Sequence, residues 1–166
     1  MIRELLRNIF FYTIILVFQL FVFNQINLLG YITPFLYLII FIHYKTSYNK
    51  TILIFLGFIT GVIIDLSVQT YGCHTFATIT ICYFRGWIEK YSFGVNSNLP
   101  SAMISGTQLI NRLTFYGIIV VFHSIIYYSL VFFNIELFWT IVLNIIINSI
   151  ITFIIIWLIS QLISNK

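Results

Sequence analysis

The stretch GFITGVIIDL, from Gly57 to Leu66, decides the fold, because it has the composition of a lipid-embedded helix and yet contains a carboxylate. Asp65 is the only acidic residue within the long apolar runs of the chain. A carboxylate at the centre of a membrane helix costs roughly 2.5–3.5 kcal/mol on insertion scales, so it normally faces protein or a wet cavity. The stretch therefore predicts a membrane protein whose helices pack around polar groups.

The composition points the same way. Apolar residues make up 61% of the chain and charged residues only 7%, whereas soluble domains carry about 25% charged residues. The 166 residues contain no long polar stretch, so we expect one integral membrane domain over 1–166 and no separate soluble domain. The apolar run behind Arg7 continues to Phe23 without a small-residue cleavage site, which predicts a retained helix rather than a cleaved signal peptide.

A transmembrane helix needs about 20 mostly apolar residues. The chain offers six such segments, which predict an all-α, polytopic membrane helical bundle with about six transmembrane helices. Their approximate ranges are 9–27, 28–44, 51–69, 72–91, 112–133 and 137–163. The second segment is the shortest and carries Pro34 near its start, where a missing N–H is tolerated. A loop over 91–111, rich in Gly, Asn, Ser and Pro, separates the fourth and fifth segments.

The distribution of basic residues favours six crossings. With the N-terminus in the cytoplasm, six crossings put all eight Lys and Arg residues at or near the cytoplasmic face. If the second segment does not cross, five of them move outside, namely Lys45, Lys50, Lys90, Arg112 and Lys166. The positive-inside rule selects the first arrangement. Both termini are therefore expected in the cytoplasm.

Glycines on the third segment predict close helix packing. Gly57 and Gly61 have the GxxxG spacing that lets two helix backbones approach closely, and Asp65 continues the same face four residues on. Gly72 follows at the turn into the fourth segment. The alternative is that these glycines fall in an apolar helix by chance.

The third and fourth segments are expected to form an antiparallel hairpin that turns near Thr70. At 1.5 Å per residue, Asp65 and His74 then differ in depth by only about 3 Å, so His74 is the predicted partner of Asp65. The pair is either a structural polar contact, which is commoner, or a proton relay. Arg85 lies deeper, and we expect it to snorkel to the cytoplasmic face with Glu89 one turn on.

The last two segments also carry polar residues at membrane depth. His123 falls in the middle of the fifth segment, and Asn144, Asn148 and Thr152 share one stripe of the sixth. Mutual hydrogen bonding between helices, at about 0.6–2 kcal/mol each, is favoured over a ligand or partner groove. The predicted intramembrane polar cluster is Asp65, His74, His123, Asn144 and Asn148. The predicted cytoplasmic-side charges are Arg85, Glu89 and Arg112.

The sequence lacks the short motifs of phosphate-binding loops, serine hydrolases, zinc proteases and CxxC sites. Cys73 and Cys82 are nine residues apart on one expected helix, which excludes a mutual disulfide. The basic residues follow one membrane face, which argues against nucleic-acid binding. We therefore expect no enzyme, no cofactor and no metal.

The longer run GFITGVIIDLSVQTYGCH, residues 57–74, resembles the central signature of the rod shape-determining protein MreD family. In that family a glycine-spaced helix ends in an Asp, and a Gly with a small or polar residue opens the next helix, which carries a basic residue as Arg85 does here. Further similarity lies in NLLGYITPFLY over 27–37, LPS over 99–101, His123 and IELF over 135–138.

The resemblance implies a non-enzymatic subunit of the cell-elongation complex that organises peptidoglycan synthesis and cell shape. The implied partners are an MreC-type membrane protein and, indirectly, MreB, RodA and a class B penicillin-binding protein. The alternative is a small transporter or substrate-binding subunit resembling energy-coupling-factor S components, with Asp65, His74, His123 and Asn148 lining a pocket. A transporter needs a cavity closed to lipid with converging polar groups, whereas a scaffold needs mutually satisfied polar groups and an open apolar groove.

Overall fold

The computed structural model describes residues 2–25, 33–45, 48–94 and 108–164. Within these ranges the regular elements are all helices, as predicted: α1 (Ile2–Phe18), α2 (Leu38–Ile42), α3 (Lys50–Val68), α4 (Cys73–Phe93), α5 (Leu109–Phe132) and α6 (Phe138–Ser164). A π-helical turn, Gln19–Phe23, extends α1, and a 3-10 turn, Ile135–Leu137, precedes α6. The predicted loop over 91–111 is shorter at both ends, and its residues 95–107 lie outside the described ranges.

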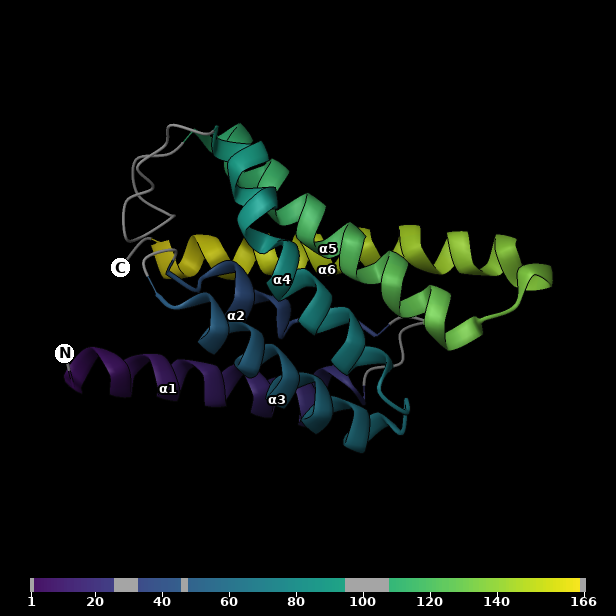
Figure 1. Ribbon diagram of the computed structural model, residues 1–166, viewed down its shortest axis with the longest axis horizontal. Helices are drawn as coiled ribbons and strands as arrows, with labels where there is room; N and C mark the ends of the chain where they lie inside the picture. The colour runs from purple at the N-terminus through teal and green to yellow at the C-terminus, as the bar shows by residue number, and fades with distance from the viewer. Residues whose placement is uncertain (1, 26–32, 46–47, 95–107, 165–166) are drawn as a thin grey trace.

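Two antiparallel helical hairpins, α3–α4 and α5–α6, form the body of the molecule (Figure 1), and α4 packs on α5 to join them. Asn24, just after the π-helical turn, donates to the hydroxyl of Ser67 near the end of α3 (2.9 Å). The beginning of α1 and the end of α6 lie at the same end of the bundle, on the left in Figure 1. The cytoplasmic placement of that end stays a prediction.

The exterior of the bundle is apolar and its interior contains polar residues. Among the described residues, three helices are long and apolar enough to cross a membrane, at Lys50–Val68, Leu109–Phe132 and Ile135–Ile163, and the apolar helical stretch Arg7–Phe23 is shorter. Large apolar side chains such as Leu66 and Trp139 are exposed. Buried polar residues include Gln19, Asp65, His74, Arg85, Glu89, His123, Asn148 and Thr152. This inversion of a soluble protein's pattern fits a bundle that lies in lipid.

The helix predicted over 28–44 is wrong in its described part. Only Leu38–Ile42 is helical, and Thr33 to Phe35 have no regular structure. Pro34 supplies no N–H and restricts Thr33 to extended conformations, so no helix continues through this point, and the described helix begins only at Leu38. Residues 28–32 lie outside the described ranges.

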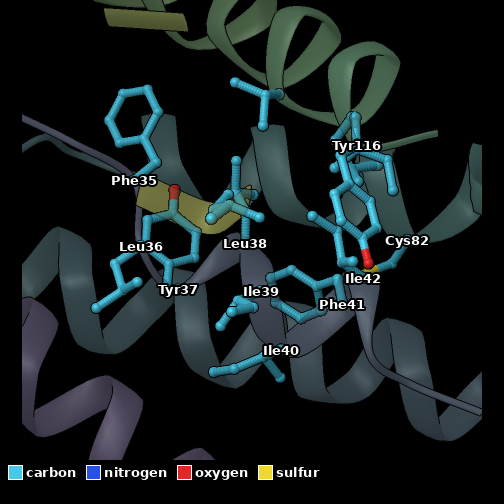
Figure 2. Packing of buried hydrophobic residues seen from close by; sticks show 14 of the residues in the cluster. Phe35, Leu36, Tyr37, Leu38, Ile39, Ile40, Phe41, Ile42, Cys82 and Tyr116 are labelled. Atoms are coloured by element: carbon cyan, nitrogen blue, oxygen red, sulfur yellow. The ribbon is translucent and has the colours of Figure 1, made fainter. Parts of the chain in front are cut away.

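We call residues 33–45 the core segment, because they occupy the middle of the bundle. Every residue from Phe35 to Ile42 is 3% exposed or less. Figure 2 shows their side chains packed among the surrounding helices, with Tyr116 of α5 and Cys82 of α4 in the same cluster. The second apolar run of the sequence is therefore the core of the protein and not a lipid-facing helix.

Candidate functional site

Two side chains from other elements hold the start of the core segment. Gln19 accepts the N–H of Tyr37 at Oε1 (3.2 Å) and donates from Nε2 to the carbonyl of Pro34 (3.1 Å). Thr152 of α6 accepts the N–H of Phe35 at Oγ1 (3.1 Å). In lipid, non-helical backbone persists only where protein groups satisfy its N–H and C=O groups. These three bonds replace the backbone hydrogen bonds that a helix would have supplied.

The end of the core segment is held by a buried arginine. Arg85 donates from Nε to the carbonyl of Phe41 (2.8 Å) and from Nη2 to the carbonyl of Tyr44 (2.6 Å). Its Nη1 pairs with Glu89 at 2.6 Å, and Arg85 and Glu89 are only 3% and 4% exposed. The last carbonyls of α2 have no N–H of their own helix to accept, so the guanidinium caps them. The pairing with Glu89 is present, but the prediction that Arg85 snorkels toward water is wrong.

At the centre of the bundle one tyrosine hydroxyl joins two histidines. The hydroxyl of Tyr37 lies 2.9 Å from Nδ1 of His74 on α4 and 2.8 Å from Nε2 of His123 on α5. Aromatic rings surround the group: Phe35 packs edge-on against both imidazoles, and Tyr127 lies 4.3 Å from His74 between ring centroids. The core segment is thereby tied to α4 and α5 at their buried faces.

Asp65 closes the α3–α4 turn through four hydrogen bonds. Its carboxylate accepts the backbone N–H groups of His74 (3.0 Å) and Thr75 (2.8 Å) and the hydroxyls of Thr70 (2.5 Å) and Thr75 (2.6 Å). The first N–H groups of a helix have no partner within it, and a negative charge at this end is favourable, so Asp65 caps α4 from the preceding helix. His74 is a partner of Asp65, as predicted, but through its backbone N–H and not through its side chain, because the imidazole faces Tyr37.

The glycines of α3 lie against α4. A Cβ added at Gly61 would overlap the backbone of Thr75 and approach Thr78 Oγ1 to 2.7 Å, and one added at Gly57 would lie 2.8 Å from Cys82 Sγ. The hydroxyl of Thr78 lies 2.9 Å from the carbonyl of Gly57 across this contact, and it shares its one proton between that carbonyl and those of His74 (2.8 Å) and Thr75 (3.0 Å) in its own helix. The small residues therefore allow a backbone approach that an interhelical hydrogen bond uses.

Gly72, unlike Gly57 and Gly61, does not lie in the contact between α3 and α4. It lies in the turn with φ of 95°, a conformation that glycine adopts without strain, and an added Cβ would meet open space. Its role is to turn the chain, and it makes no close helix contact.

The remaining predicted site residues do not join a single cluster. Asn144 donates to the carbonyl of Thr140 within its own helix (2.8 Å). Asn148 is buried in α6, and its amide has no hydrogen-bond partner among the described residues. Arg112 lies in the first turn of α5, half-buried. The structure thus brings His74 and His123 together through Tyr37, and it leaves Asp65 and the two asparagines in separate contacts.

The sequence analysis missed two residues on which the core segment depends. Gln19 is the one amide within the apolar run from Ile9 to Phe23, and the argument that singled out Asp65 applies to it as well. Tyr37 is one of 11 tyrosines, and nothing in the spacing distinguishes it.

The surface of the described residues has grooves on both helical hairpins. The α3–α4 groove, at the turn end of that hairpin, has a volume of about 880 Å³ and is lined by Val62, Asp65, Leu66, Gln69, Tyr71, Gly72, Thr75, Phe76 and Ile79. The α5–α6 groove has a volume of about 320 Å³ and is lined by Leu113, Gly117, Val120, Val121, Ser149, Ile150, Phe153 and Ile154. Both open on the outside of the bundle.

An apolar exterior, buried polar contacts and helices able to span a bilayer define a helical integral membrane protein. The family model of the rod shape-determining protein MreD matches residues 1–162 of the 166-residue chain. The chain belongs to that family, as its sequence motifs indicated, and membership implies a role in determining rod shape. Comparisons with curated proteins and with solved structures found no match.

Proposed function

We propose that this chain is a non-enzymatic scaffold subunit of the cell-elongation complex in the bacterial inner membrane. It binds an MreC-type membrane protein, and through it the chain organises peptidoglycan synthesis by proteins of the MreB, RodA and class B penicillin-binding kinds. The observation that carries the proposal is that Tyr37 joins His74 and His123 at the centre of the bundle, while the α3–α4 groove opens on the outer surface.

The interior supports a structural role for its polar side chains. Arg85 is bound to two carbonyls and to Glu89, and Tyr37 is bound to two imidazoles. Groups that satisfy each other in this way rigidify a bundle and specify its packing. A rigid bundle presents its outer faces in a fixed arrangement, which is what a scaffold requires.

The exterior supports interaction through membrane-facing surfaces. Among the described residues, many large apolar side chains on the helices are exposed and therefore available to a partner. Between membrane helices, association depends on shape fit, close packing and interhelical hydrogen bonds rather than on the hydrophobic effect. A groove between two helices offers a partner helix a surface of complementary shape.

The same interior argues against the transporter alternative. That function places Asp65, His74, His123 and Asn148 around a pocket. Instead, Phe35 and Tyr37 pack against both imidazoles, and Asp65 faces the start of α4. The centre is filled by aromatic rings of the chain itself.

The proposal is tested by purifying the tagged full-length chain from detergent-solubilised native membranes and identifying co-purified proteins by mass spectrometry. A tagged, unrelated multi-helix membrane protein of similar abundance is the control. Enrichment of MreC-type and penicillin-binding proteins over that control supports a scaffold of the elongation complex. Enrichment of an ATPase module, or recovery of the chain alone with a bound small molecule, contradicts it.

A further inference from the structure

Lys50 and Lys90 lie at the same end of the α3–α4 hairpin, at the start of α3 and near the end of α4. Both side chains are exposed, and among the described residues neither has an ion-pair partner. Glu89 is next to Lys90 in the sequence, but it is 4% exposed and bound to Arg85. This end of the hairpin therefore carries two exposed positive charges that no described carboxylate compensates.

Exposed aromatic rings accompany Lys90 along the outer side of α4. Tyr83, Trp87 and Tyr91 are the positions i, i+4 and i+8, and Lys90 is i+7, so one helix face presents all four side chains. All three rings are more than half exposed. Tyr and Trp have an apolar body and a polar end, and they are enriched where the hydrocarbon of a bilayer meets its headgroups. This face thus combines the cationic and aromatic side chains that suit the polar boundary of a bilayer.

Lys50 reaches the same face from the neighbouring helix. Its ammonium nitrogen lies 4.6 Å from the centroid of the Tyr83 ring, within the range of a cation–π contact. An ammonium group has three N–H donors, and one ring face does not occupy them all. The contact therefore positions the ammonium beside the aromatic rings and leaves donors for an anion. A side chain that is already positioned loses less conformational freedom when it binds.

Gly86 leaves the helix backbone accessible between these side chains. It lies between Tyr83 and Lys90, at i+3 from the tyrosine, and a Cβ added to it would meet no atom within 4 Å. Glycine is common where a ligand approaches the backbone closely, because it has no side chain in the way. The open space at Gly86 allows a headgroup to approach the lysines and the rings from outside the bundle.

We propose that these side chains form a binding site for the phosphate headgroup of an anionic phospholipid. We call the site the lysine–aromatic face; it consists of Lys50, Tyr83, Trp87, Lys90 and Tyr91. The two ammonium groups bind the phosphate, and the aromatic rings lie against the adjoining glycerol and upper acyl chains. An anionic headgroup is preferred, because a zwitterionic headgroup carries its own cation and gains less from the lysines. The site does not depend on the proposed scaffold function.

A lipid fits this face better than a second copy of the chain. The carboxylates of α3 and α4 are engaged, since Asp65 caps α4 and Glu89 is bound to Arg85. Glu136 is exposed, but it lies at the α5–α6 turn, on the right in Figure 1, whereas α3 begins and α4 ends on the left. A second copy with the same orientation in the bilayer therefore holds Glu136 at the other membrane face. Phospholipid headgroups, in contrast, surround the protein at the level of the lysines.

The first test compares two tryptophans of similar exposure. Trp87 is 74% exposed, and Trp139, at the opposite end of the bundle in α6, is 76% exposed. The full-length chain is purified with only one of them, as Trp139→Phe/Trp157→Phe or as Trp87→Phe/Trp157→Phe, and is placed in phosphatidylcholine vesicles. Phosphatidylglycerol or phosphatidylcholine with bromine atoms near the headgroup is then added. Fluorescence quenching gives the apparent affinity of each site for each lipid.

Trp87 is expected to report an affinity for phosphatidylglycerol on the order of tenfold above that for phosphatidylcholine, because lysines near the headgroups attract anionic lipid. Trp139 has no such lysines in its helix turn, and its preference should stay below about twofold. Equal affinities at Trp87, or the same preference at both tryptophans, overturn the proposal. A second copy covering the face would shield Trp87 from both brominated lipids, so an absence of quenching at Trp87 overturns it as well.

The second test removes charges in the protein that retains Trp87. Lys50→Gln should lower the phosphatidylglycerol preference about fivefold, and Lys50→Gln/Lys90→Gln should abolish it. Arg7→Gln removes one exposed cation from α1, outside the lysine–aromatic face, and should keep the preference. Lys50→Arg keeps the charge and should keep the preference too. Unfolding midpoints in detergent show that each variant is folded. A preference that survives the loss of both lysines, or that falls equally in Arg7→Gln, overturns the proposal.

Discussion

The guanidinium of Arg85 donates to the carbonyl oxygen of Phe41 at 2.8 Å, so a cation of α4 ends the helix α2 in the middle of the bundle. At the other end of the core segment Gln19 and Thr152 bind backbone groups in the same manner. The fold thus encloses a stretch of chain that is mostly not helical, and it does so by providing polar side chains from three other helical elements. The stability of the bundle should depend on these few residues more than on any single apolar contact.

Replacement of Arg85 is the first test of this dependence. Arg85→Met keeps much of the side-chain volume but leaves Glu89 buried without its cation and two carbonyls without a donor. Removing one partner of a buried pair costs about 3–5 kcal/mol, so we expect a large fall in the thermal unfolding midpoint in detergent. Lys90→Met, at an exposed position of the same helix, is the control and should change little. Equal unfolding midpoints for the two variants would show that the buried hydrogen bonds and ion pair of Arg85 do not stabilise the protein.

Gln19 offers a test at the other end of the core segment. Gln19→Leu has nearly the same size but cannot bind the N–H of Tyr37 or the carbonyl of Pro34. A buried polar group left without a partner costs about 1–3 kcal/mol, and two such groups should lower the unfolding midpoint clearly. Gln25→Leu changes the same residue type at an exposed site and serves as the control. A stable Gln19→Leu protein would mean that the segment is held by packing alone.

Much of this architecture followed from the sequence, and the reasons for the failures are physical. Apolar runs and glycine spacing predicted the helices and the close α3–α4 approach, because those features act locally. The core segment was predicted as a helix since its hydrophobicity resembles that of its neighbours. Its real conformation depends on Gln19, Thr152 and Arg85, which are far away in sequence. Spacing alone placed Asp65 and His74 at one depth, but it did not distinguish a bond to the imidazole from a bond to the backbone.

Gly61 and Gly86 form a matched pair of glycines for testing the helix contact. Gly61→Ala should separate α3 from α4, because the new Cβ would overlap the backbone of Thr75, and overpacking of this kind costs about 1–3 kcal/mol or more. Gly86→Ala, on the α4 face that is open around it, should leave stability unchanged or raise it by about 0.5–1 kcal/mol. Unfolding midpoints of the two purified variants give the comparison. A Gly61→Ala protein as stable as Gly86→Ala would contradict the contact.

The Tyr37 hydroxyl predicts a specific protonation pattern. Among the described residues, Nδ1 of buried His123 has no hydrogen-bond partner. A buried N–H without an acceptor is worse than an unused lone pair, so His123 should carry its proton on Nε2 and donate to Tyr37, which then donates to Nδ1 of His74. The chain has three histidines, so imidazole nitrogen-15 NMR can resolve them. If neutral His123 instead carries its proton on Nδ1, its Nε2 must accept from the Tyr37 hydroxyl, and the predicted direction of these two hydrogen bonds is wrong.

Tyr37→Phe tests the energetic role of the same hydroxyl. The variant keeps the ring and leaves both imidazoles without their shared partner, so we expect a loss of about 1–3 kcal/mol for each unsatisfied nitrogen. Tyr71→Phe removes a hydroxyl from a fully exposed ring and should stay within about 0.5 kcal/mol of the wild type. Thermal unfolding of the purified proteins is the measurement. A Tyr37→Phe protein as stable as Tyr71→Phe would mean that the two imidazoles do not need the bridge.

Asp65 both caps α4 and lines the α3–α4 groove on the outer surface, and two substitutions separate the roles. Asp65→Asn keeps one acceptor oxygen and a side chain suited to capping α4, so the protein should fold with a stability loss of about 1–3 kcal/mol. The variant loses the negative charge, however, and each mole of folded protein should therefore recover less membrane partner than the wild type does. Asp65→Ala removes all four acceptor contacts and should lower both yield and capture.

Glu136→Gln is the control for the charge itself, because it removes an exposed carboxylate at the α5–α6 turn. Partner recovery is measured per mole of monodisperse protein for all three variants. If Asp65→Asn captures as much partner as Glu136→Gln, the carboxylate serves only to cap α4.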